Sequence, residues 1–464
     1  MTPSPVELFC RRFPGRSPAY LVEAPGRVNL IGEHTDYNGY PVLPMALDRA
    51  IRVALATRDD GRIVARSPLA AYGERAFDLA REIAPSPTGD WANYLKAAAQ
   101  GLVAHYGKGV VWRGFDAAVT GDVPSGAGLS SSSALVVATA LALLAANRRA
   151  MPLMELADLL ADAERYVGTA GGGMDQAVCL RAVRGHALRI DFFPLAVEPV
   201  PMPPGVSVVV ANSLVRAEKT GAALLKYNRR PLECRLATLL IAGVIGRRTG
   251  ADLAAARRLA DVGPARLSAL LSRDEWERVV FDEILAEESY TKGQVAAALG
   301  TDVPSLDRTA LALRDGSAFP EPTDGFRLRR RVRHVIREAE RVQAATRALR
   351  EGDVVELGRL MDASHASCRD DYQISTPELD ALVEIMREAG ALGARLTGAG
   401  FGGCAVALVR TEDERAVLDA VRHRYFGERL GLRESPPAEY GRWEDVLFAT
   451  TAGPGAKVTQ LGLT

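Results

Sequence analysis

A glycine-rich turn that leads into four consecutive serines is the feature that most constrains the fold of this chain. The segment reads Pro124-Ser-Gly-Ala-Gly-Leu-Ser-Ser-Ser-Ser-Ala, and the apolar run that continues to Ala146 predicts a helix beginning at the serines. The first turn of a helix has unpaired backbone N–H groups and a partial positive charge, so it is a natural seat for phosphate. One serine would cap the helix, whereas four beside two glycines and a proline indicate a phosphate-binding loop.

This loop differs from those of the common nucleotide-binding domains. No Gly-x-x-x-x-Gly-Lys-Ser/Thr segment occurs, so the lysine that usually clamps the phosphates is missing. A Gly-x-Gly-x-x-Gly pattern at Gly398, Gly400 and Gly403 follows a helical segment and precedes a strand-like one. That order is the reverse of a dinucleotide-binding fingerprint, so we reject that interpretation as well.

A carboxylate interrupts the apolar face of a second predicted helix, at residues 152–167. Glu164 lies in the middle of a stripe formed by Leu153, Leu156, Ala157, Leu160, Ala163 and Val167. An inward carboxylate is costly unless it is paired or binds a metal ion. The inward position of Glu164 is equally compatible with an internal salt bridge and with a role as a Mg²⁺ ligand, because Mg²⁺ prefers hard oxygen donors.

Two further segments carry candidate ligand-binding side chains. Asp175 follows three glycines in Gly168-Thr-Ala-Gly-Gly-Gly-Met-Asp-Gln, where the backbone approaches a ligand closely. Near the N-terminus, Arg27, Glu33, His34 and Asp36 crowd a turn between two apolar strands. Carboxylates accept hydrogen bonds from vicinal hydroxyls, so this set suits a polyhydroxylated ligand. A zinc site is disfavoured because no His-Glu-x-x-His occurs.

The composition excludes several classes of protein. The 464 residues carry 57 Lys+Arg and 57 Asp+Glu, so no net charge attracts nucleic acid or an anionic membrane. The longest apolar run, Ala134–Ala146, is shorter than the about 20 residues that span a bilayer, and no signal-peptide pattern is present. Five scattered cysteines form no Cys-x-x-Cys pair. The basic run Arg327–Arg333 continues into acidic residues, which is typical of a solvent-exposed helix face. Together these features predict a cytoplasmic protein that binds neither nucleic acid nor membrane.

The pattern of strands and helices changes near residue 212. Strand-like patterns dominate before it and helical ones after it, which predicts two α+β domains, residues 1–211 and 212–464. Strands are expected within 19–56 and at 110–120, 187–192, 206–211 and 404–409. Helices are expected at 91–105, 152–167, 232–247, 252–258, 276–287, 327–350 and 379–389.

Four of these segments together resemble the GHMP family of small-molecule kinases. Gly26-Arg-Val-Asn-Leu-Ile-Gly-Glu-His-Thr-Asp-Tyr-Asn-Gly is similar to the signature of the galactokinase branch, and Pro124–Ala134 is similar to the family's nucleotide loop. Gly172-Gly-Met-Asp-Gln resembles its Asp-bearing turn, and Thr397–Gly403 its third motif. The resemblance implies a two-domain α+β fold, with an N-terminal domain like the second domain of ribosomal protein S5 and a ferredoxin-like C-terminal domain.

The resemblance also implies roles for individual residues. It implies transfer of the ATP γ-phosphoryl to the anomeric hydroxyl of galactose, with Asp175 as general base, Arg27 keeping that carboxylate ionised, and Ser132 and Glu164 holding Mg²⁺. The implied sugar-contacting residues are Arg27, Glu33, His34, Asp36, Gly172, Asp175 and Tyr227. The implied nucleotide-binding residues are Pro124, Gly126, Gly128, Leu129, Ser130, Ser131, Ser132 and Ser133.

Two alternatives stay open at this point. The segments 168–176, 232–237 and 364–370 are closer to N-acetylgalactosamine kinases, whereas Thr35 and Asn38 follow the galactokinase pattern. A non-catalytic sensor of galactose and ATP usually has a damaged phosphate loop, but here the serine run is complete. We expect a monomer whose partners are a sugar and ATP.

Overall fold

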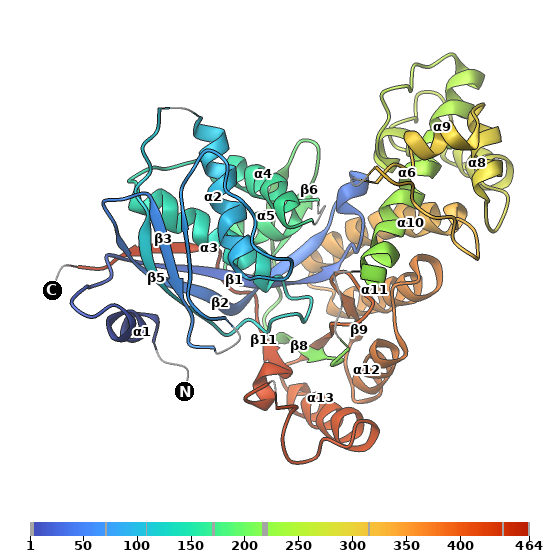
Figure 1. Ribbon diagram of the computed structural model, residues 1–464. Helices are drawn as coiled ribbons and strands as arrows, with labels where there is room; N and C mark the ends of the chain where they lie inside the picture. The colour runs from blue at the N-terminus through green and yellow to red at the C-terminus, as the bar shows by residue number, and fades with distance from the viewer. Residues whose placement is uncertain are drawn as a thin grey trace.

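The computed structural model describes residues 4–69, 72–107, 109–168, 172–215, 221–313, 316–438 and 440–462, with the backbone alone for 221–224. It contains a six-stranded sheet, a four-stranded sheet and a two-stranded hairpin, with helices packed around them (Figure 1). Both ends of the chain lie beside the six-stranded sheet (Figure 1).

The six-stranded sheet has the order β12-β1-β2-β5-β3-β4. Its strands are β1 (Tyr20–Ile31), β2 (Leu43–Thr57), β3 (Arg62–Arg66), β4 (Arg75–Asp78), β5 (Phe115–Gly121) and β12 (Lys457–Gln460). All neighbours are antiparallel except β3 and β5. The hairpin of β6 (His186–Asp191) and β7 (Ala196–Pro201) joins it through a bridge between Val42 and Ile190.

Alternating side chains give this sheet two apolar faces. One face packs on α3 (Ser131–Ala146) and α5 (Met174–Arg181), which share their core with α2 (Ala92–Tyr106) and α4 (Leu153–Ala163), and the other face packs on α1 (Pro5–Arg12). Helix α3 is apolar on all sides, which suits its position in the middle of the core.

The four-stranded sheet is antiparallel, with the order β11-β8-β10-β9. Its strands are β8 (Val206–Asn212), β9 (Gly393–Thr397), β10 (Cys404–Arg410) and β11 (Leu447–Thr450). The surrounding helices are α10 (Leu328–Glu351), α11 (Val354–Ser367), α12 (Pro377–Glu388) and α13 (Glu414–Ala420). Valines of β8 and β10 share one core with the ends of β1 and β2, so the two sheets are joined by buried apolar surface.

The two sheets do not divide the chain at residue 211. Strand β8 pairs with β10 and β11 and therefore belongs to the second sheet, although all of it except Asn212 lies within the predicted first domain. Strand β12 pairs with β1 and returns the C-terminus to the first sheet. The second sheet therefore includes a strand from before residue 212, and the first sheet takes its last strand from the far end of the chain.

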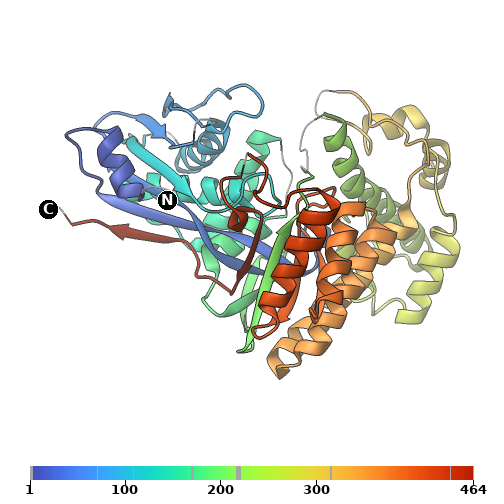
Figure 2. The same ribbon diagram turned by 90° about the horizontal axis from the view of Figure 1, so that it is seen from below.

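A helical lobe at one end of the molecule holds α6 (Gly221–Thr249), α7 (Arg273–Glu277), α8 (Lys292–Leu299) and α9 (Val303–Arg308) (Figures 1 and 2). The helix expected at 252–258 is wrong, because Asp252 accepts a hydrogen bond from the backbone of Ala254 and forms a turn instead. The helix expected at 276–287 is α7 followed by a π-helical segment, Arg278–Ile284.

Two other expectations need correction. The helix expected at 152–167 is α4, which ends at Ala163 and is followed by a 3₁₀ turn at Glu164–Val167. Of the arginines expected on a solvated face, Arg331 is fully buried and forms an ion pair with Glu233, 2.5 Å away. In the part of the chain that the structure describes, no helix is both long and apolar enough to cross a membrane.

Candidate active site

Arg27 connects the first strand to the glycine-rich loop. Its Nε donates to Asp175 Oδ1 at 2.7 Å, and its Nη1 donates to the Gly128 carbonyl at 2.7 Å. The Arg27 side chain is only 8% exposed, so this ion pair is poorly screened by solvent. The guanidinium group of Arg27 therefore joins three segments that are distant in the sequence: β1, the loop after β5 and the start of α5.

Ser130 completes this junction. It has a left-handed conformation, with φ of 58°, and its Oγ donates to Asp175 Oδ2 at 2.5 Å. A serine hydroxyl has one proton, so this side chain cannot also donate to a phosphate oxygen. Among the predicted phosphate ligands, Ser130 is thus placed to orient Asp175.

The predicted nucleotide loop lies between β5 and α3. Gly126 and Gly128 have positive φ angles, and the first α-helical hydrogen bond of α3 runs from Ala134 N to Ser130 O. The amides of residues 131–133 precede that bond, so the helix has no carbonyl to offer them. Pro124, Leu129 and Ser133 are buried, and Ser131 and Ser132 are half-buried. A phosphate group would therefore meet backbone amides first and the Ser131 and Ser132 hydroxyls second.

The turn between β9 and β10 supports this loop from the second sheet. A Cβ atom on Gly398 would lie 2.8 Å from Gly128 O, and one on Gly403 would lie 3.0 Å from Ala127 O. Only glycine permits this approach, which explains why the segment Thr397–Gly403 is rich in glycine.

Glu33 is buried directly beside this turn. Its Oε1 accepts hydrogen bonds from Arg395 Nη1 at 3.2 Å and from Gly398 N at 2.8 Å. Burial raises the pKa of Glu33, and the charges of Arg395 and Arg27 only partly oppose this effect.

His34 is enclosed by aromatic rings. Its Nε2 donates to the Ala399 carbonyl at 3.2 Å, and its Nδ1 then accepts from the Tyr37 hydroxyl at 2.9 Å. Burial lowers the pKa of His34 to about 3, so the ring is neutral. Both ring nitrogens are engaged by the protein, and the imidazole faces Tyr227 with ring centroids 5.7 Å apart.

Asp36 and Gly172 are in direct contact. Gly172 N donates to Asp36 Oδ2 at 3.1 Å, and a Cβ atom on Gly172 would lie 2.5 Å from the same oxygen. Burial, and then the nearby charges of Asp175 and Glu33, raise the pKa of Asp36 to about 6. Burial and the same three carboxylates also raise the pKa of Tyr227. All the sequence-predicted sugar residues therefore lie in one cluster.

The two candidate Mg²⁺ ligands share a neighbour, Tyr94. Burial and then the charge of Glu164 raise the pKa of Tyr94, and a hydrogen bond with Ser132 lowers it. Burial, and then the charges of Asp175 and Glu164, raise the pKa of Cys179, so both carboxylates lie near this thiol. No group of three or more His, Cys, Asp and Glu side chains among the described residues is arranged to hold a metal ion. One carboxylate and one hydroxyl nevertheless fit Mg²⁺, which takes its remaining ligands from water and phosphate.

Several buried polar residues around the cluster were missed by the sequence analysis. Arg395 lies on β9, and His334 and Glu338 lie on α10, where they bond to the backbone of the Gly32–Glu33 turn. Periodicity identifies α10 as an amphipathic helix but does not show which of its charged residues are buried.

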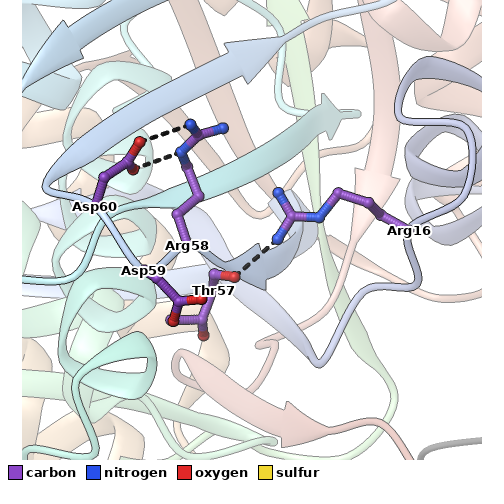
Figure 3. Close-up of a pocket in the computed structure, with 5 residues that line it drawn as sticks. All are labelled: Arg16, Thr57, Arg58, Asp59 and Asp60. Atoms are coloured by element: carbon purple, nitrogen blue, oxygen red, sulfur yellow. Dashed lines mark hydrogen bonds and ion pairs between the residues drawn. The ribbon is translucent and has the colours of Figure 1, made fainter.

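A surface depression at the other end of β2 is separate from this cluster. It is lined by Arg16, Thr57, Arg58, Asp59 and Asp60 (Figure 3). Arg58 donates to Asp60 at 2.7 Å and to the buried Asp116 at 2.9 Å, and Arg16 also pairs with Asp116. Its arginines are thus paired within the protein. The 15 residues of β2 lie between the depression and the segment that follows the Glu33 turn.

Comparison with known proteins identifies three family models in this chain. The galactokinase galactose-binding signature matches residues 7–57, the GHMP kinase N-terminal domain residues 93–182, and the GHMP kinase C-terminal domain residues 345–427. A galactokinase of Dictyostelium discoideum is 35% identical over 97% of this chain and 92% of its own length. A galactokinase of Chloroflexus aggregans is 38% identical over 86% of each chain.

Solved structures agree with these matches. The crystal structure of Lactococcus lactis galactokinase complexed with galactose superposes with a TM-score of 0.74, at 28% identity and 98% coverage of both chains. A mevalonate kinase has a TM-score of 0.52 at 18% identity, covering 86% of this chain and 94% of its own, which supports the fold alone. The expected two-domain GHMP kinase fold is confirmed, and the chain belongs to the galactokinase branch of the GHMP kinase family.

Proposed function

We propose that this protein transfers the γ-phosphoryl group of ATP to the anomeric hydroxyl of D-galactose, giving α-D-galactose 1-phosphate. The observation that carries the proposal is the Arg27–Asp175–Ser130 junction. It joins a segment that matches a galactose-binding signature to a loop whose helix start suits phosphate. A sugar hydroxyl and a phosphoryl group would therefore meet at Asp175.

Asp175 is assigned as the group that accepts the proton of the anomeric hydroxyl. Arg27, 2.7 Å away, favours its ionised form, and Ser130 holds its second oxygen. Phosphoryl transfer requires little covalent chemistry from the protein, so orientation of the acceptor and stabilisation of charge supply most of the rate. The guanidinium of Arg27 is also close enough to the loop to offset charge that develops on the phosphoryl group.

The carboxylates of Glu33 and Asp36 are assigned to the sugar hydroxyls, and Tyr227 closes the same cluster. His34 is neutral and is assigned chiefly to shaping the pocket, because both of its nitrogens are already bonded. A sugar with a misplaced hydroxyl would leave one of these buried acceptors unpaired, which disfavours epimers strongly.

ATP is assigned to the amides at the start of α3, with Ser132 and Glu164 as the residues that would hold Mg²⁺. The ion would neutralise charge on the β- and γ-phosphates. Glu164→Gln is expected to raise the Kd for Mg·ATP by about tenfold, while the Kd for galactose stays unchanged. Isothermal titration with each ligand checks this, and equal weakening of both would identify Glu164 as part of a structural ion pair instead.

The raised pKa of Asp36 predicts a pH dependence. The carboxyl group accepts hydrogen bonds at both oxygens only when ionised, so kcat/KM for galactose is expected to fall as the pH drops through about 6. The measurement is a kcat/KM profile from pH 5 to 8. Asp36→Asn should have a lower kcat/KM and lack this acidic limb, and an unchanged limb in that variant would assign the titration to another group.

A panel of galactose, N-acetylgalactosamine, glucose, galacturonate and arabinose with ATP and Mg²⁺ tests the function. ADP release is expected to be fastest with galactose. Faster turnover of N-acetylgalactosamine would change the assigned sugar and keep the chemistry, whereas binding of galactose without sugar-dependent ADP release would indicate a sensor. The cytoplasmic, monomeric state expected from the sequence is part of the proposal, and gel filtration checks the oligomeric state.

A further inference from the structure

Arg395 is a buried cation that the mechanism above does not use. It lies on β9, and its side chain has no exposed surface. Its Nη1 donates to the Asn29 carbonyl at 3.0 Å and to Glu33 Oε1 at 3.2 Å, and its Nε donates to Ser364 Oγ at 3.1 Å. The guanidinium is therefore held on three sides by groups from β1, the Glu33 turn and α11.

Arg395 holds one oxygen of the Glu33 carboxylate and supplies a positive charge next to it. Oε1 of Glu33 is occupied by Arg395 and by the amide of Gly398, and the Asn29 side chain also lies within hydrogen-bonding reach of the carboxylate, so a ligand hydroxyl would approach it at Oε2. A buried carboxylate retains its charge only when a cation or several donors stabilise it. The nearby guanidinium of Arg27 is already bonded to Asp175, so Arg395 is the cation that contacts Glu33 directly.

We propose that Arg395 is a positioning residue for sugar recognition, which acts by fixing the Glu33 carboxylate so that one of its oxygens is directed to the substrate. The inference rests on the proposed function, because it assigns Glu33 to a sugar hydroxyl. It adds a residue of the second sheet to a pocket whose other assigned sugar residues come from the first domain and α6.

The backbone around Glu33 is held by side chains of α10, one of which is bonded to α11. Glu338 Oε1 accepts from Gly32 N at 2.8 Å and from Ser364 Oγ at 2.5 Å. His334 Nε2 donates to the Glu33 carbonyl at 3.0 Å. Because Ser364 bonds to both Glu338 and Arg395, the carboxylate and the backbone of Glu33 are held by one connected network.

The groups around Glu33 predict how the pH dependence of kcat/KM should change when Arg395 is replaced. The charged and titratable groups around it are Arg27, Asp36, Tyr227, His334, Glu338, Cys368 and Arg395. Glu338 has a pKa lowered to about 2 and His334 one lowered to about 4, while burial raises those of Tyr227 and Cys368. Of the carboxyl groups in this set, Glu33 and Asp36 have pKa values raised by burial, and the charge of Arg395 opposes this rise at Glu33.

The experiment compares wild type, Arg395→Met, Arg395→Lys, Glu33→Gln and the double variant Glu33→Gln/Arg395→Met. Arg395→Met is expected to raise the KM for galactose about tenfold or more, with the KM for ATP changed by less than about threefold. Without the cation the pKa of Glu33 rises further, so kcat/KM for galactose should begin to fall at a higher pH than in the wild type, where Asp36 sets the acidic limb. Arg395→Lys keeps a charge and should return this limb towards its wild-type position.

The double variant separates positioning from stability. If Arg395 acts through Glu33, adding Arg395→Met to Glu33→Gln should change the KM for galactose by less than about threefold. This pair contains no unpaired buried charge, so it is expected to fold even if Arg395→Met alone does not.

Arg58→Met is a matched control, since it also removes an arginine from a buried carboxylate but lies at the far end of β2 (Figure 3). It should lower the melting temperature and leave the KM for galactose unchanged.

Two results would overturn the inference. One is an unchanged KM for galactose and an unmoved acidic limb in folded Arg395→Met. The other is an equal loss from Arg395→Met in the wild-type and Glu33→Gln backgrounds. Wild-type protein that neither binds nor phosphorylates galactose would instead overturn the proposed function, and this inference with it.

Discussion

Asp175→Ala is expected to lower kcat by about a thousandfold, equivalent to about 4 kcal/mol of barrier. The substitution removes the proposed proton acceptor and leaves Arg27 Nε and Ser130 Oγ without their partner. The nucleotide loop is built by backbone amides and by contacts with Gly398 and Gly403, so the Kd for Mg·ATP should stay within about threefold. A coupled ADP-release assay at saturating substrates and a titration with Mg·ATP measure the two effects.

Two further variants distinguish proton acceptance by Asp175 from the orientation of its side chain. Asp175→Asn keeps the shape of the side chain and an oxygen that accepts from Arg27, but it cannot take up the proton, so it should be nearly as slow as Asp175→Ala. Ser130→Ala removes only the bond to Oδ2 and should cost about tenfold. An Asp175→Ala enzyme with more than about a tenth of the wild-type kcat would contradict the assignment of Asp175 as the base.

The residues that meet in the site could be identified from the sequence because each lies in a short segment with its own local explanation. Asp175 follows a run of glycines, and the serines stand before an apolar helix. These features depend on neighbours in the chain, and the structure brings them together at Arg27. Glu164 was selected for a weaker reason, since α4 ends at Ala163 and the apolar stripe does not continue as an α-helix to its position.

What the sequence could not predict depends on partners that are distant in the chain. The pattern of β8 is that of any buried strand, and nothing local indicates that it pairs with β10, nearly two hundred residues later. Arg331, Glu338 and Arg395 carry charges, and charged residues are usually exposed. They are buried here because Glu233, Arg341 and Glu33 neutralise them from other elements. Burial of a charge is therefore a property of the pair, and a sequence read one residue at a time does not contain it.

Arg27→Lys is expected to lower kcat by about a hundredfold although it preserves the charge. Arg27 uses two different nitrogens, Nε for Asp175 and Nη1 for the Gly128 carbonyl, each at 2.7 Å. A lysine ammonium is a single atom on a flexible stem, so it cannot keep both bonds in the geometry of a planar fork. Either Asp175 or the phosphate loop would lose its fixed position, and the acceptor hydroxyl would no longer be aligned with the phosphoryl group.

The matched control for this change is Arg58→Lys. Arg58 also uses Nε and Nη1 for two acceptors, Asp60 at 2.7 Å and Asp116 at 2.9 Å, but it lies beside the depression at the other end of β2 (Figure 3). Its replacement should lower the melting temperature without changing kcat or either KM. If Arg27→Lys retained full kcat, charge alone would suffice at this position, and the fork that joins Asp175 to the phosphate loop would have no part in the rate. A loss confined to Arg27→Lys would mean that the alignment of sugar and nucleotide depends on that one planar group.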